Sequence, residues 1–336
     1  MHCLSRFFFC IIAIQFSLFC IAQPGKHIHF TPSVYYREFS AKPEPSLRIK
    51  AGDTITTQSV DAGGFDRGGT KVTERGNPLT GPFFIEGAMP GDVLAVKLID
   101  VRLNRNYATT LNTFIPKIFP GKETMKLWRS AKLVRWKLDT VANVGSPADS
   151  NGYTGELKVP LHPFLGCVGV APQGDKGASS GSSGSYGGNM DFLFNTVGAT
   201  VYLPVSHPGA FLFLGDGHAV QGDGELNGDA LETSMHFSFS VSLIKKEVLA
   251  ISAPVIENDK YWMFFGIEKS LDKSLRKATE AMVLWLEHRY GLSRREASQV
   301  VGPAIEYRIP KTAGGITEVV AMIPKDIVRQ LESNKK

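Results

Sequence analysis

A strict alternation of apolar and polar side chains is the feature that most constrains the fold of this chain. Residues 236–243 place phenylalanine, valine or leucine at every second position, and histidine or serine at the positions between them. Successive side chains of a β-strand point to opposite faces of a sheet. The pattern therefore predicts a half-buried antiparallel strand at residues 236–243.

Short apolar runs separated by turn-forming residues extend this prediction to most of the chain. Residues 93–103 follow a Pro-Gly-Asp turn and are apolar on both faces, which favours a buried strand. Residues 200–205 and 210–214 flank the sequence Ser-His-Pro-Gly, a pattern that predicts a hairpin. Many short strands of this kind indicate a mostly β protein, a β-sandwich or jelly-roll-like fold.

The C-terminal part departs from the strand pattern. Helical spacing predicts a helix over residues 269–290 with one apolar stripe buried against a sheet. The stripe consists of Leu271, Leu275, Ala278, Met282 and Leu286. A Ser-x-x-Glu capping box at residues 293–296 predicts a second helix, and two apolar runs at residues 305–309 and 316–323 predict a small terminal β-hairpin. By composition, the Gly/Ser-rich residues 177–188 form a flexible loop.

The first 22 residues have the organisation of a secretory signal peptide. A start carrying Arg6 precedes a short apolar run at residues 7–20, and Ala22 offers a small residue for cleavage. The run is too short and too interrupted for a membrane-spanning helix, which needs about 20 apolar residues. We therefore expect an exported protein, periplasmic or extracellular, whose domain of residues 23–336 has no membrane span. A division of this domain into two β subdomains near residues 150–160 stays open.

Charge and cysteine content narrow the function classes. Cleavage would remove three of the four cysteines, so Cys167 has no partner for an intrachain disulfide and is interpreted as a packed thiol. The net charge of +5 is weak and spread along the chain, which gives no support for nucleic-acid binding.

The strongest candidate site lies in residues 203–225, where an apolar strand runs into polar residues spaced by glycines. These residues are Asp216, His218, Gln221, Asp223 and Glu225. Glycine permits close backbone approach, so short carboxylates can converge on one point. A Gly-Asp-Gly sequence is also common in solvated turns, but two of them around a histidine and a glutamine favour a site.

Three further clusters are candidates for functional residues, but each also has an ordinary structural interpretation. His162 lies between two strand-like runs, Asn189 and Asp191 follow paired glycines, and Asp61 begins a Gly/Asp loop at residues 61–66. Each of them could also be a turn former or a hydrogen-bonded structural residue.

Four of these segments resemble the acetamidase/formamidase family in order and spacing. They are residues 78–92 (PLTGPFFIEGAMPGD), 162–172 (HPFLGCVGVAP), 187–191 (GGNMD) and 215–225 (GDGHAVQGDGE). The similarity covers residues 27–325. It implies a mostly β enzyme that hydrolyses the C–N bond of short linear amides and depends on a metal in at least some members. The Gly/Ser segment before Gly187 is longer than the family pattern and borders the presumed site.

The resemblance gives the candidate residues roles, because amide hydrolysis needs a nucleophile, oxyanion stabilisation and a proton for the leaving nitrogen. The candidate ligands of a divalent metal ion, zinc or calcium, are Asp61, Asp191, Asp216 and His218. Glu225 is the candidate base and then acid, followed by Asp223 and His162, and His162 is also a candidate for orienting the carbonyl. Gln221 and Asn189 are candidates for hydrogen bonding to the amide. We expect a small-molecule amide as partner and a homo-oligomer, a dimer.

An exported binding module is the alternative. In that interpretation, the Asp/Gly loops of a β-sandwich hold Ca²⁺ and present it to a carbohydrate or a protein. His218 favours the enzyme, because imidazole suits a borderline transition ion better than Ca²⁺.

Overall fold

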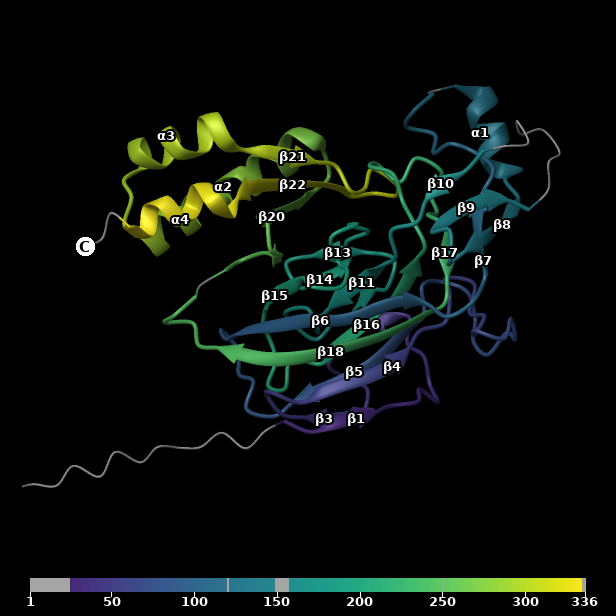
Figure 1. Cartoon of the computed structure of the whole chain (residues 1–336), viewed down its shortest axis with the longest axis horizontal. Coiled ribbons are helices and arrows are strands. Elements are labelled where there is room, and N and C mark those ends of the chain that lie inside the picture. The colour runs from purple at the N-terminus through teal and green to yellow at the C-terminus, as the bar shows by residue number, and fades with distance from the viewer. Residues whose placement is uncertain (1–24, 120, 149–156, 250, 334–336) are drawn as a thin grey trace, which may run out of the picture.

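Two large β-sheets share one apolar core in the computed structural model, which describes residues 25–119, 121–148, 157–249 and 251–333 (Figure 1). The first sheet has nine strands in the order β1-β4-β18-β6-β15-β19-β20-β22-β21. Their bounds are β1 (His27–His29), β4 (Thr54–Gln58), β18 (Met235–Ile244), β6 (Val93–Leu103), β15 (Thr200–Pro204), β19 (Val255–Glu257), β20 (Tyr261–Glu268), β22 (Thr317–Pro324) and β21 (Glu306–Arg308).

The second sheet has eleven strands in the order β10-β9-β8-β7-β17-β16-β11-β14-β13, with β5 paired to β16 and β3 paired to β5. Their bounds are β10 (Val159–Pro160), β9 (Val144–Pro147), β8 (Leu133–Asp139), β7 (Tyr107–Leu111), β17 (Glu232–Thr233), β16 (Leu212–His218), β11 (Phe164–Gly169), β14 (Gly187–Asn189), β13 (Ser183–Gly184), β5 (Leu79–Ile85) and β3 (Leu47–Ile49). A separate pair joins β2 (Glu38–Phe39) to β12 (Ala178–Ser179). The helices are α1 (Lys122–Arg129), α2 (Leu271–Tyr290), α3 (Arg294–Ala304) and α4 (Lys325–Ser333).

The alternating segment forms β18, as predicted, and β18 pairs antiparallel with β4 and β6. Its Phe237 and Phe239 are fully buried in the shared core. The ring of Phe239 packs edge-on against Phe83 of β5, with ring centroids 5.2 Å apart. Because β5 belongs to the second sheet, this contact joins the two sheets across the core.

The turn predicted as a hairpin at residues 206–209 instead carries the chain from one sheet to the other. β15 pairs with β6 and β19 in the first sheet, whereas β16 pairs with β5, β11 and β17 in the second. Gly209, Ala210 and Phe211 have φ angles of 81°, 56° and 55°. Three consecutive residues in the left-handed region redirect the chain, so the two apolar runs cannot pair with each other.

The Gly/Ser-rich segment is ordered into β12, β13 and β14, which corrects the expectation of a flexible loop. β14 pairs with β11, and its glycines allow an approach that side chains would block: a Cβ on Gly187 would lie 2.4 Å from the carbonyl oxygen of Val168. The hydroxyl of Ser183 donates to the buried carboxyl group of Glu318 on β22. Composition suggested mobility, but the glycines here serve close packing.

The C-terminal helices lie together at one end of the molecule, with α2 against β20 and β22 (Figure 1). The predicted capping box of α3 and the predicted antiparallel pair β21–β22 are both present. The expected stripe of α2 is only partly correct, because Leu271 and Leu275 are 45% and 46% exposed. The helix meets the sheet through Ser274 instead, since Gly266 of β20 leaves room for its backbone. Within the described part of the chain, no helix combines the length and apolar character needed to cross a membrane.

The fold class predicted from the sequence is thus confirmed: mostly β, with a C-terminal helical segment and a terminal β-hairpin. The proposed signal peptide, residues 1–22, lies outside the described residues. The subdomain boundary near residues 150–160 overlaps the undescribed residues 149–156 and stays a prediction, as does the dimer.

Candidate active site

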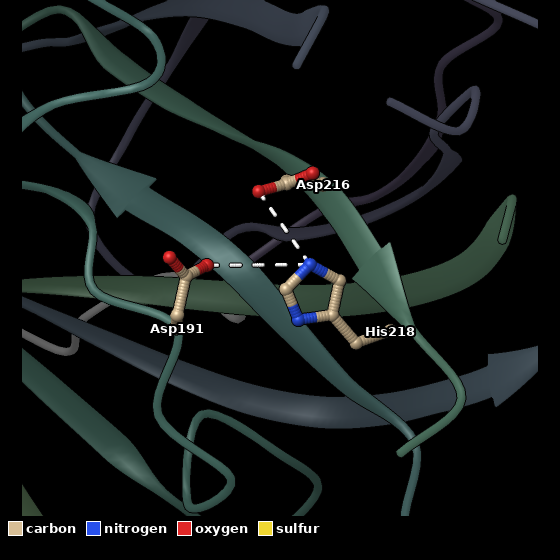
Figure 2. Close-up of side chains that lie close together, drawn as sticks. All are labelled: Asp191, Asp216 and His218. Atoms are coloured by element: carbon tan, nitrogen blue, oxygen red, sulfur yellow. Dashed lines mark ion pairs between the residues drawn. The ribbon is translucent and has the colours of Figure 1, made fainter. Parts of the chain in front are cut away.

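Asp191, Asp216 and His218 lie together in the interior of the second sheet (Figure 2). The Nε2 atom of His218 is 3.6 Å from Oδ2 of Asp216 and 4.0 Å from Oδ1 of Asp191. All three residues are at most 1% exposed. The sequence analysis singled out all three residues, and the fold brings them together from two segments of the chain.

Adjacent strands explain this convergence. Asp216 and His218 are two residues apart on β16, so both side chains point to the same face. β11 separates β16 from β14, and Asp191 follows the end of β14. Asp191 and Asp216 have positive φ angles of 43° and 57°. Such angles are uncommon for non-glycine residues and cluster at functional sites, where the surroundings impose them.

Gly166 on β11 provides the floor of the site. A Cβ at this position would lie 2.7 Å from Oδ1 of Asp191, 2.8 Å from Oδ2 of Asp216 and 2.8 Å from Cε1 of His218. The space between the three side chains is therefore one that a single methyl group at Gly166 would fill. The glycine keeps open the point on which the three side chains converge.

The three side chains around this space have the chemistry of ligands for a divalent cation. Oδ1 of Asp191, Oδ1 of Asp216 and both ring nitrogens of His218 are buried without a hydrogen-bond partner among the described protein atoms. Unpaired buried carboxylate oxygens are costly, and metal coordination is one way in which proteins satisfy them. Carboxylate oxygens and imidazole nitrogens are both zinc ligands in proteins. The group could therefore hold a metal ion.

The other oxygens of the two aspartates are held by neighbouring side chains. Lys311 donates to Oδ2 of Asp191 at 2.5 Å, and Asn77 donates to Oδ2 of Asp216 at 2.9 Å. Each aspartate is thus fixed through one oxygen while its Oδ1 atom stays unpaired. This is the arrangement expected when neighbouring groups orient metal ligands.

The electrostatic environment favours a positive charge at His218, either a protonated imidazole or a bound cation. Burial lowers the pKa of His218, but the carboxylates of Glu232 and Asp216 raise it well above its ordinary value. Oε1 of Glu232 lies 3.3 Å from Nε2 of His218, and burial raises the pKa of Glu232 to about 8. The negative potential that stabilises a protonated imidazole would also stabilise a bound cation.

Glu225 lies at the edge of this group. It is buried, has a φ angle of 50°, and its Oε2 atom is 3.9 Å from Nζ of Lys311. Burial and the nearby Asp191 raise the pKa of Glu225 well above its ordinary value. For Lys311, burial lowers the pKa, but Asp191 and Glu225 reverse this effect and raise it. Lys311 is therefore a buried cation shared by Asp191 and Glu225.

Three of the predicted site residues lie apart from the buried group. Both carboxylate oxygens of Asp61 accept hydrogen bonds, Oδ2 from Arg105 at 2.6 Å and Oδ1 from the backbone of Phe65 at 2.9 Å. Asp223 pairs with Arg308 at 2.8 Å and is partly exposed. His162 is exposed, and its backbone N–H donates to Ala219. The geometry does not bring these three residues into the Asp191, Asp216 and His218 group.

The two amide side chains predicted to bind substrate differ in their free atoms. Asn189 is fully engaged: its Nδ2 donates to Asp191 and its Oδ1 accepts from the Cys167 thiol at 2.9 Å. Gln221 donates through Nε2 to the backbone oxygens of Asp191 and Pro310, and its buried Oε1 has no partner among the described protein atoms. Gln221 therefore retains an acceptor near the site.

Sequence reasoning missed Asn77, Glu232 and Lys311. Glu232 follows the turn-forming residues 227–229 and Lys311 lies just before Gly314 and Gly315, but neither is part of a Gly-Asp-Gly sequence like those around His218. The neighbouring sequence does not distinguish the buried charges of Glu232 and Lys311 from solvated ones. Only the tertiary fold brings Glu232 to His218 and Lys311 to Asp191. Asn77 immediately precedes the segment 78–92, which is the only signal that could have drawn attention to it.

Comparisons with known proteins point to one family. A model of the acetamidase/formamidase family matches residues 170–330, which include Asp191, Asp216 and His218. A formamidase of Methylophilus methylotrophus is 25% identical over 294 residues, covering 67% of this chain and 70% of that protein.

Two solved structures are similar over most of the chain. The acetamidase of Yersinia enterocolitica is 26% identical with a TM-score of 0.77, covering 91% of this chain and 94% of that structure. A predicted acetamidase/formamidase of Thermoanaerobacter tengcongensis is 25% identical with a TM-score of 0.78, covering 92% of this chain and 99% of that structure.

Proposed function

We propose that this hydrolase of non-peptide C–N bonds in linear amides, which resembles the acetamidase/formamidase family, converts short amides to carboxylate and ammonia. We further propose that it uses a divalent metal ion at Asp191, Asp216 and His218. The observation that carries the proposal is the convergence of two buried carboxylates and a buried imidazole above Gly166, side chains that each have a donor atom without a hydrogen-bond partner among the described protein atoms. The alternative of a Ca²⁺-dependent binding module has no comparable support among the relatives.

The metal assignment follows from the donor set. Oδ1 of Asp191, Oδ1 of Asp216 and a ring nitrogen of His218 are the free donors. When bound, a divalent ion would supply a water of lowered pKa and polarise the amide carbonyl. The imidazole favours zinc over calcium, because Ca²⁺ prefers oxygen ligands alone.

Glu225 is the proposed carrier of protons. Its carboxylate would accept a proton from the attacking water and return it to the departing nitrogen. Lys311 stands between Glu225 and Asp191, so it holds both carboxylates at fixed positions. Gln221 completes the arrangement, because its free Oε1 can accept a hydrogen bond from the N–H of a primary amide.

The enclosure of the site supports a small substrate. His218 packs at right angles against Phe164, with ring centroids 4.9 Å apart, and the three proposed ligands are almost fully buried. A formamidase and an acetamidase among the similar proteins point to amides of one or two carbons. Formamide and acetamide are therefore the first substrates to test.

The decisive measurement is ammonia release from formamide, acetamide, butyramide and a dipeptide, with metal content determined on the same sample. We expect turnover to fall as the acyl chain lengthens, the dipeptide to resist hydrolysis, and a chelator to abolish turnover until metal is restored. Full turnover in protein that contains no metal would rule out the metal-assisted reaction while leaving amide hydrolysis intact.

Export remains part of the proposal, and it rests on residues 1–22 alone. The positive start, the apolar run and Ala22 motivate it. N-terminal sequencing of protein from the exported fraction of a native-like host should begin near Gln23. An intact Met1 on protein retained in the cytoplasm would contradict it.

A further inference from the structure

An exposed basic and apolar arm, described at residues 112–119 and 121–133, runs from the end of β7 into the start of β8 and contains α1. Figure 1 shows α1 at the opposite end of the molecule from α2, α3 and α4. The arm has one acidic residue, Glu123, and five basic residues, all exposed. The basic residues are Lys117, Lys122, Lys126, Arg129 and Lys132. The charge that looked evenly spread in the sequence is thus concentrated in one place.

Large apolar side chains are exposed on the same arm. They are Phe114, Phe119, Met125, Leu127 and Leu133, with exposed fractions between 36% and 62%. α1 buries none of its own side chains. Soluble proteins rarely gather exposed apolar side chains in one place unless that surface binds something.

The base of the arm is fixed to the body of the protein. Ile115 is buried, and its backbone N–H donates to Leu226 at 2.8 Å. The Lys117 ammonium donates to the carbonyl of Thr312, and Asn227 donates to the carbonyl of Leu111. The outer part, Phe119 and residues 121–133, therefore extends from a base that is fixed to the body of the protein.

We propose that this arm docks the protein onto the surface of an anionic phospholipid bilayer. A short helix that combines lysine and arginine with phenylalanine, leucine and methionine has the composition of an interfacial anchor. The apolar side chains would enter the boundary between headgroups and acyl chains, and the basic side chains would face the anionic headgroups.

Two other partners fit the arm less well. In a symmetric contact with a second copy, two identical arms with an excess of positive charge would face each other and repel. Single-stranded nucleic acid requires flat faces for base stacking. Phe114 and Phe119 have such faces, but the two rings pack edge-on against each other with centroids 5.6 Å apart. The exposed Met125, Leu127 and Leu133 supply none.

The test is sedimentation with vesicles of phosphatidylcholine alone or mixed with phosphatidylglycerol, at low and high salt. Three double variants accompany the unaltered chain. Phe119→Ser with Leu127→Ser removes apolar contacts, and Lys126→Ser with Arg129→Ser removes charge. The control, Lys269→Ser with Lys273→Ser, removes two exposed charges outside the arm.

We expect binding to the anionic vesicles, weakened by salt because exposed charges are screened. Each basic residue near such a surface contributes about fivefold, so the Lys126/Arg129 variant should bind roughly twentyfold more weakly. The apolar variant should also bind more weakly, and the Lys269/Lys273 control should bind like the unaltered chain. Circular dichroism should show that every variant keeps the fold.

Several outcomes would overturn the proposal. One is the absence of binding to anionic vesicles, and another is binding that the arm variants leave unchanged. A fall in molecular mass of the arm variants, measured by light scattering, would show instead that a second copy covers the arm. Tighter binding of the arm to single-stranded nucleic acid than to vesicles would assign it to that partner.

Discussion

His218 and Glu225 are assigned different tasks, so their loss should have different consequences. His218→Ala removes a nitrogen ligand and should remove bound metal and turnover together. Glu225→Gln keeps the size of the side chain but cannot accept a proton, so metal should remain while turnover falls by about 10²-fold. Metal content and ammonia release measured on the same samples separate the two roles.

Matched controls are available for both substitutions. His236→Ala removes a histidine that lies on β18 of the other sheet, and Glu306→Gln changes an exposed glutamate on β21. Both control variants should retain metal and turnover. Near-normal turnover in Glu225→Gln would place the base elsewhere, and metal retained in His218→Ala would remove His218 from the ligand set.

Gly166 offers a test of the metal site in which none of the proposed ligands is substituted. The methyl group of Gly166→Ala would lie within 2.8 Å of Asp191 and Asp216, in the space assigned to the ion. We expect at least about a tenfold loss of metal affinity, because displaced ligands cannot regain their geometry. Gly222→Ala, where an added Cβ has no neighbour within 4 Å, should bind metal normally. Equal metal affinity in both variants would show that the ion lies away from Gly166.

The sequence indicated the site residues that lie in Gly/Asp clusters and missed those that lie outside these clusters. Asp216 and His218 were recognisable because two glycine-flanked aspartates surround the histidine within ten residues. Lys311 carries no such mark, because its burial between Asp191 and Glu225 depends on contacts across more than 80 residues. Asp61 has the same Gly/Asp pattern as Asp216, but its partner is Arg105, a pairing that no local pattern reveals.

At the scale of elements, periodicity predicted where strands and helices lie in the sequence better than it predicted which of their faces is buried. The alternation of β18 and the capping box of α3 are local properties, and both were predicted. The orientation of α2 depends on Gly266, which lies on β20 and lets Ser274 approach the sheet. The apolar spacing of α2 also matched a stripe through Leu275. The sequence alone could not show whether the face with Leu275 or the face with Ser274 packs against the sheet.

Helix α2 therefore predicts a contrast between two substitutions. Met282→Asp would place a charge in a fully buried position against the sheet and should cost at least about 3 kcal/mol of unfolding free energy. Leu275→Asp changes a half-exposed position and should cost less than about 1 kcal/mol. Urea denaturation of both variants measures the difference. Equal losses would show that the first turns of α2 also pack against the sheet.

At the scale of the whole molecule, the candidate site is part of the structure that holds the second sheet together. Asp216 and His218 lie on β16, which pairs with β5, β11 and β17, and Asp191 follows β14 on the far side of β11. Buried carboxylates without a partner destabilise a fold, and an ion that binds only the folded state stabilises it. Metal bound at this site should therefore stabilise the whole chain.

Metal removal should lower the melting temperature of the whole chain. Binding at a concentration about 100 times the dissociation constant contributes about 2.7 kcal/mol. For a protein of this size, that corresponds to a fall of roughly 4 °C when a chelator removes the ion. His218→Ala, which lacks a ligand, should melt at a temperature that the chelator does not change. Calorimetry of both proteins, with and without chelator, makes this comparison without measuring activity. A chelator-independent melting temperature in the unaltered chain, at full metal loss, would show that the buried aspartates are satisfied without an ion.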